Sequence, residues 1–237
     1  MKNTVLHKAD TRGHADHGWL NAYHSFSFAS WYNPDRVQFG VLRVLNDDTI
    51  AAGMGFGTHP HDNMEIITIP LEGDLAHKDS MGNTETIKTG DVQVMSAGTG
   101  VQHSEFNPNA DQQTKLFQIW LFPKVRNVEP RYQQITLDTT EQKNNFAQIL
   151  SPNPDDAGVW IHQDAWFHLS DFEAGVEKKY EIKKEGNGLY AFVISGIITI
   201  DGQELETRDG LGITDFKTLD IKATTDAKFL LMEIPMK

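Results

Sequence analysis

THPHDNME at residues 58–65 and VQHSE at residues 101–105 each place two potential metal ligands two positions apart. In a β-strand, side chains two residues apart point to the same face of the sheet, so each pair can converge on one point. The two stretches therefore predict two strands whose ligands meet inside a small β-barrel. The four predicted ligands are His59, His61, His103 and Glu105. Pro60 cannot donate a backbone hydrogen bond, which places the first of these strands at an edge.

Short segments rich in branched and aromatic residues surround the two stretches. The expected strands cover residues 37–45, 65–71, 91–95 and 115–122. Turn residues separate them, which is typical of a β-sandwich or β-barrel. No long stretch has helical periodicity, and residues 142–150 and 170–173 are expected to be short helices or loops at most.

The second half of the chain shows the same pattern of short strands and turns after a connecting segment. Residues 150–158 (LSPNPDDAG) hold two prolines and two aspartates, which is typical of a connection. Residues 196–206 (GIITIDGQELE) then predict a hairpin with a type I′ turn at Asp201-Gly202. We therefore expect an all-β fold of two tandem antiparallel barrels, with residues 1–140 forming the first and residues 141–237 the second.

Bulk composition excludes several classes of function. The chain has 237 residues, 39% of them hydrophobic, and a formal net charge of −12, so a phosphate backbone or an anionic membrane surface would repel it. No apolar leader or membrane-length apolar run is visible, and we expect a cytoplasmic protein without direct nucleic-acid or membrane contact. The chain has no cysteine, so disulfides and thiolate ligands are excluded.

Three imidazoles and one carboxylate form a nitrogen-rich donor set. Such a set suits Fe(II), Ni(II), Co(II), Mn(II) or Zn(II) better than Ca(II) or Mg(II). We expect one divalent transition metal per chain, with iron named first and the other four as alternatives. Four protein ligands leave one or two positions open for a substrate or O2, which favours a working site over a closed structural one.

The spacing around these ligands resembles the paired signature of the cupin superfamily. Gly53 lies six residues before His59, and Asn107 follows His103 by four. Three departures stand out: Glu65 to Gly73 is one residue longer than usual, Ser96 replaces a proline, and four residues separate Gly98 from His103. Five segments then resemble the pirin family, above all its bacterial quercetinase-like members. These segments are GHADHGW (13–19), HSFSFA (24–29), THPHDNME (58–65), HKDSMG (77–82) and SAGTGVQHSE (96–105).

The pirin resemblance implies a bicupin whose metal lies only in the N-terminal barrel, at His59, His61, His103 and Glu105. It also implies a quercetin 2,3-dioxygenase, an oxidoreductase that cleaves a flavonol ring with O2 and releases carbon monoxide. The partners would be an aromatic flavonol and O2. Glu105 would serve as catalytic base as well as ligand, because a carboxylate beside the metal can take the proton of the flavonol hydroxyl.

The second barrel has no histidines with which to repeat the site. The last histidine is His168, and the positions corresponding to the first pair are Ile182 and Lys184. We therefore expect this barrel to pack against the first one or cover it.

Several residues keep two interpretations at this point. Glu65 is either a partner of a ligand or a charge on a strand, and His77 with Asp79 is either structural or near the substrate. Trp19 and Trp31 are expected in the core rather than in an aromatic pocket, and the remaining histidines in packing or exposed roles. The alternative function, also implied by the family, is an iron-dependent redox-sensing regulator that binds transcription factors or metabolic enzymes.

Overall fold

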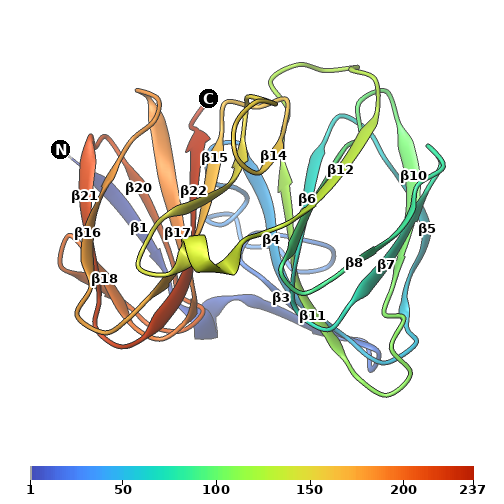
Figure 1. Cartoon of the computed structure of the whole chain (residues 1–237), viewed down its shortest axis with the longest axis horizontal. Helices are drawn as coiled ribbons and strands as arrows, with labels where there is room; N and C mark the ends of the chain where they lie inside the picture. Colours follow the sequence, from blue (N-terminus) through green and yellow to red (C-terminus); the bar gives the residue numbers. More distant parts are fainter. Residues whose placement is uncertain (1) are drawn as a thin grey trace.

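The computed structural model describes residues 2–237, which form 22 strands and two short 3-10 helices. The helices are Ala9–Thr11 and Thr139–Gln142, and no helix in the described part of the chain is long and apolar enough to cross a membrane. Two barrels lie side by side, the first mainly in blue to green and the second mainly in yellow to red, apart from the dark-blue N-terminal strand that lies in the second (Figure 1). The prediction of an all-β bicupin is confirmed.

The first barrel consists of a large and a small antiparallel sheet. The large sheet has the order β12-β9-β6-β11-β4-β3-β2 and the small sheet β5-β10-β7-β8. The large-sheet strands are β2 (Gly13–Asp16), β3 (Leu20–His24), β4 (Leu42–Ile50), β6 (Glu65–Glu72), β9 (Asp91–Ser96), β11 (Thr114–Leu121) and β12 (Arg131–Thr136). The small-sheet strands are β5 (Gly55–His61), β7 (Leu75–Asp79), β8 (Thr84–Ile87) and β10 (Val101–Phe106). β5, which carries the predicted ligands His59 and His61, is an edge strand, as Pro60 predicted.

The second barrel has the same two-sheet plan, with orders β1-β20-β17-β22-β15-β13-β14 and β16-β21-β18-β19. Its large-sheet strands are β1 (Asn3–His7), β13 (Ala147–Ser151), β14 (Val159–Trp160), β15 (Trp166–Phe172), β17 (Asn187–Ser195), β20 (Gly210–Thr214) and β22 (Ala227–Pro235). Its small-sheet strands are β16 (Glu177–Glu181), β18 (Ile198–Ile200), β19 (Gln203–Leu205) and β21 (Thr218–Ala223). The N-terminal β1 pairs with β20, so the chain starts in the second barrel and then crosses to the first (Figure 1). The boundary at residue 140 stays a prediction.

The two large sheets pack against each other and form the main core between the barrels. Ile67 and Phe117 belong to this core from the first barrel, and Phe167 and Phe192 from the second. The rings of Phe117 and Phe192 meet edge to face at 5.4 Å. Each fully buried side chain of this kind contributes roughly 1.5–3 kcal/mol to stability, so this contact holds the two barrels together.

The interiors of the two barrels differ in a way that positions the site. One continuous apolar cluster fills the second barrel, with Phe172, Phe229 and Ile221 fully buried. The first barrel contains two small apolar clusters, one around Leu116 and one around Met95. Polar side chains lie inside this barrel as well, and the candidate site lies among them.

Local expectations are confirmed in part. The hairpin of β18 and β19 turns at Asp201 and Gly202, whose φ angles of 47° and 83° fit the predicted type I′ turn. The strand expected at residues 37–45 is wrong in its bounds, because it begins at Leu42 after a loop. The loops or helices expected at 142–150 and 170–173 are also wrong, because β13 and β15 occupy much of those segments as core strands of the large sheet.

Candidate metal centre

β5 and β10 pair antiparallel, with His103 directly opposite His59. The register then shifts by one residue, so that Glu105 lies opposite Phe56 rather than opposite Gly57. Such a bulge bends a strand and re-aims its side chains. The extra residue lies on β5 between Phe56 and His59, and strand alternation still directs the four predicted ligands to one interior.

The structure brings the three predicted histidines together. Their ring centroids are 4.4 Å apart for His59 and His103, 4.9 Å for His59 and His61, and 5.0 Å for His61 and His103. Each ring offers a nitrogen within 4.8 Å of the other two. His103 is buried, whereas the two histidines of the edge strand are half-buried and form the open side of the group.

Hydrogen bonding around these rings fits a metal. Nδ1 of His59 lies 2.8 Å from the carbonyl oxygen of Gly57, so this nitrogen can donate and leave Nε2 with a free lone pair. Neither ring nitrogen of the buried His103 has a hydrogen-bond partner among the described residues. A buried imidazole without a partner is unfavourable, and a bound cation would satisfy one of its nitrogens.

The protonation states fit a metal too. Burial, together with a smaller effect of neighbouring imidazoles, lowers the pKa of His103 to about 3 and that of His61 to about 4. Both rings are therefore neutral near pH 7, which is the form that binds a metal.

Glu105 lies deeper in the same interior and is 4% exposed. Nε2 of Gln118 donates to both of its carboxylate oxygens, at 2.8 Å and 3.1 Å. Burial raises the pKa of Glu105 to about 7, and the hydrogen bond from Gln118 opposes that rise. A metal ion at the three histidines would favour the carboxylate form. An oxygen of Glu105 groups most closely with nitrogens of His77 and His103 rather than with the two histidines of the edge strand.

Glu65 lies on the other face of its strand. Thr68, three residues on, hydrogen-bonds Gln118 in the barrel interior, whereas the Glu65 carboxylate accepts the Ser96 hydroxyl at 2.7 Å. It also accepts the backbone N–H of His162, which lies in the second half of the chain. Glu65 therefore links the two halves, and the serine that departs from the cupin pattern is its partner.

His77 lies beside the three histidines but is held separately. Its Nε2 lies 3.1 Å from an oxygen of Asp79, and its ring centroid is 5.4 Å from that of His103. The Asp79 carboxylate also accepts the backbone N–H groups of Met81 and Asn83. The pair thus fixes the turn after β7, and the second nitrogen of His77 has no partner among the described residues.

A cavity of about 200 Å³ opens beside the three histidines. Its apolar and aromatic lining is Leu20, Ala22, Phe28, Phe56 and Trp120, and its polar lining is His24, Asn46, Asp48, His59, His61, His103, Glu105 and Gln118. Asn46, Asp48 and Gln118 were not identified from the sequence. Their strands carry other polar residues as well, such as Asp47 and Lys115, so no local pattern marked these three as inward-facing.

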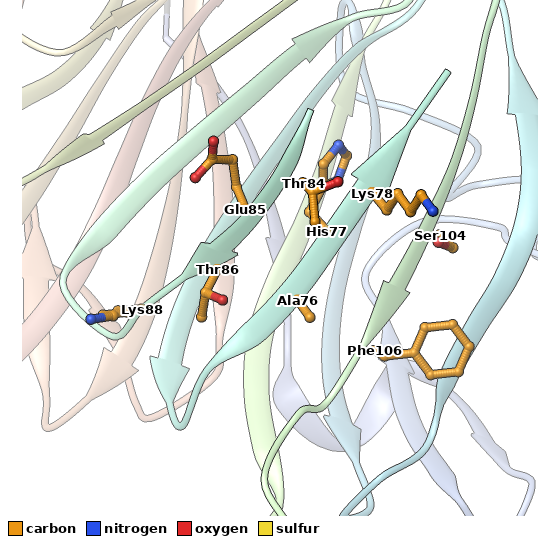
Figure 2. A pocket seen from close by; sticks show the side chains of 9 residues that line it. All are labelled: Ala76, His77, Lys78, Thr84, Glu85, Thr86, Lys88, Ser104 and Phe106. Atoms are coloured by element: carbon orange, nitrogen blue, oxygen red, sulfur yellow. The ribbon is translucent and has the colours of Figure 1, made fainter. Parts of the chain in front are cut away.

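A larger, open hollow of 640 Å³ lies on the outside of the small sheet, away from this cavity. Figure 2 shows its nine lining side chains, which come from β7, β8, β10 and the turn after β8. Lys78, Ser104 and Phe106 alternate along their strands with the buried His77, His103 and Glu105, of which His77 also contributes to the lining. The hollow therefore holds the outer faces of the strands whose inner faces carry the site.

Other expectations about aromatic and histidine residues have clear outcomes. Trp19 packs against the cluster around Leu116 and does not line the cavity, as expected. Nδ1 of His7 is 2.9 Å from the hydroxyl of Tyr190, and His7 is buried. His168 is buried inside the second barrel against Tyr180.

Two family models match the chain, one in each half. Residues 5–121 match the family model Pirin, and residues 148–234 match the model of the quercetinase C-terminal cupin domain.

Individual relatives match over nearly the whole length. A quercetin 2,3-dioxygenase of Escherichia coli K12 is 43% identical over 230 residues, covering 97% of this chain and 98% of the relative. A pirin-like protein of Caulobacter vibrioides is 40% identical over 225 residues, covering 94% and 96%. The crystal structure of the bacterial pirin YhhW from E. coli in complex with nickel(II) superposes with a TM-score of 0.93 at 41% identity, covering 98% of this chain and 99% of that one.

Proposed function

The chain belongs to the pirin family, and from that premise we propose that it is a metal-dependent flavonol 2,3-dioxygenase that opens the ring of quercetin with O2 and releases carbon monoxide. The observation that carries the proposal is the cavity beside His59, His61 and His103, with Glu105 in its wall. The name of the E. coli relative and the nickel bound to YhhW support the same activity. A cytoplasmic location belongs to this proposal.

In this proposal, His59, His61 and His103 hold one divalent transition metal through ring nitrogens, and Glu105 provides the fourth ligand. Iron, nickel, cobalt, manganese and zinc all suit this donor set. When bound, the metal acts as a Lewis acid that lowers the pKa of a hydroxyl group coordinated to it.

Glu105 takes the proton of the flavonol 3-hydroxyl on a carboxylate oxygen. Burial raises the pKa of the Glu105 carboxyl, whereas a metal ion at the histidines would favour its carboxylate form, which is the form that accepts a proton. Gln118 keeps the carboxylate in place because it donates to both oxygens.

The shape of the cavity sets how much of the substrate enters. Phe28, Phe56 and Trp120 provide flat apolar surface for an aromatic ring. A volume of about 200 Å³ is below the range of roughly 300–1,000 Å³ for sites that enclose a whole drug-sized ligand. The reacting part of the flavonol therefore enters, and the remainder extends past the half-buried His59 and His61.

The cavity favours an enzyme over the redox-sensing regulator. A regulator needs a surface that changes with the oxidation state of its metal, and it needs no aromatic-walled cavity beside that metal. Protein partners belong only to that alternative.

Quercetin absorbance under O2 tests the proposal, with metal content measured in the same samples. Wild-type protein loaded with iron, nickel, cobalt or manganese should consume quercetin. Glu105→Gln should keep its metal and lose about 100-fold or more in rate, since a positioned base contributes that much. Unchanged quercetin with fully loaded wild-type protein would reject the proposal.

A further inference from the structure

One carboxyl group inside the first barrel lacks a partner. Asp48, on β4, is 3% exposed, and its Oδ1 atom has no hydrogen-bond partner among the described residues. Buried polar atoms are nearly always paired, because an unpaired one destabilises the folded protein. Asp48 therefore calls for a partner that does not belong to the chain's own side chains.

The Asp48 side chain points into the cavity beside the candidate metal centre. Its neighbours across the sheet are Ala22 on β3 and Leu116 on β11, neither of which offers a polar side-chain atom. Asp48 lines the same cavity as His103 and Glu105. A molecule that fills this cavity is thus the available partner for the carboxyl.

The surroundings of Asp48 also determine its protonation state, and therefore which hydrogen bonds it can form. Burial raises the pKa of the Asp48 carboxyl well above its usual range, and the charges of Asp47 and Glu105 raise it further. This favours the neutral acid, which has one O–H donor and one carbonyl acceptor. A phenolic hydroxyl likewise both donates and accepts, so the two groups are complementary.

We propose that Asp48 is a specificity-determining residue, which hydrogen-bonds a second hydroxyl group of the aromatic ligand while the first hydroxyl lies at the metal centre. The preferred substrate class is then a polyhydroxylated flavonol rather than one that carries the 3-hydroxyl alone. This inference rests on the proposed function, and it adds a contact made by a residue outside the predicted ligands.

Two ligands that differ only in ring hydroxyls test the contact. Nickel-loaded protein is titrated without O2, by quenching of tryptophan fluorescence, with 3,5,7-trihydroxyflavone and with 3-hydroxyflavone. Asp48→Leu should raise the dissociation constant of 3,5,7-trihydroxyflavone about tenfold, which corresponds to the loss of one net hydrogen bond. The dissociation constant of 3-hydroxyflavone should stay within about twofold of the wild-type value. Asp48→Asn, which still donates and accepts, should keep the selectivity. Asp155→Leu, which removes an exposed carboxyl of the second half, is the matched control.

Thermal unfolding separates this role from a structural one. Because the carboxyl is buried and unpaired, Asp48→Asn and Asp48→Leu should melt at the same temperature as the control or higher. Substitution of an aspartate with a structural role would lower the melting temperature instead. Equal effects of Asp48→Leu on both ligands, or a melting temperature lowered in both Asp48 variants, would overturn the inference alone. Failure of wild-type protein to bind either flavonol would overturn the proposed function and the inference together.

Discussion

Nε2 of Gln118 lies 2.8 Å from Oε1 and 3.1 Å from Oε2 of Glu105. The carbonyl oxygen of the same amide accepts the indole N–H of Trp120 at 3.2 Å, which fixes which way the amide faces. Trp120 also lies edge to face with His61, at 4.9 Å between ring centroids. The cavity wall and the candidate metal centre are thus joined by one continuous set of contacts.

Gln118→Leu should lower the rate of quercetin turnover about tenfold to 100-fold with metal still bound, because Glu105 loses the group that orients it. Loss of a partner for a buried carboxyl should also raise the pKa of Glu105 further. Turnover and metal content of the same preparation measure this effect. Gln148→Leu, on a strand of the second barrel, should change neither, and equal losses in both variants would assign Gln118 a general structural role.

His103→Ala should abolish metal binding, because it removes the histidine that lies between the edge-strand pair and Glu105. His168→Ala provides the matched control, since His168 is equally buried but lies in the other barrel. Elemental analysis after metal loading should give one metal per chain for the control and a small fraction of that for His103→Ala. Full metal content in His103→Ala would show that the metal is held elsewhere.

Glu65→Ala should keep the metal and lower the free energy of unfolding by about 1–3 kcal/mol, because the Ser96 hydroxyl and the His162 N–H lose their acceptor. Urea unfolding and elemental analysis measure the two effects separately. A Glu65→Ala protein that loses its metal as completely as His103→Ala would place Glu65 at the centre after all.

The i, i+2 spacing of potential ligands was enough to predict that His59, His61 and His103 converge, because strand alternation is a local property. The same rule could not place Glu65, whose face depends on which side of β6 meets the second barrel. It also could not detect the extra residue on β5, between Phe56 and His59, that shifts the register between β5 and β10.

Residues that contact the candidate site from other strands were harder to predict. Asp48 and Gln118 lie on other strands than the predicted ligands, and only the order β11-β4-β3 of the large sheet brings them to one cavity. The pairing of β1 with β20 was missed for the same reason, since pairing across 200 residues leaves no local pattern in the sequence.

Acid should destabilise the protein through His168, which is 3% exposed and whose pKa burial lowers to about 4. In the unfolded chain this group titrates near 6.5, so between those values the unfolded state binds a proton that the folded state does not. The stability contributed by the neutral ring is complete above pH 6.5 and is lost as pH falls toward 4. Urea unfolding of metal-free protein from pH 7.5 to 4.5 should show a shallower loss for His168→Gln than for wild type. Parallel curves would contradict this assignment.

The carbon monoxide formed per quercetin consumed tests the central claim most directly. Metal-loaded protein under O2 should release about one carbon monoxide for each flavonol ring opened, and His103→Ala should release none above the background. Quercetin loss without carbon monoxide, or neither quercetin loss nor carbon monoxide from fully loaded wild-type protein, would contradict the assignment of this centre as a flavonol dioxygenase.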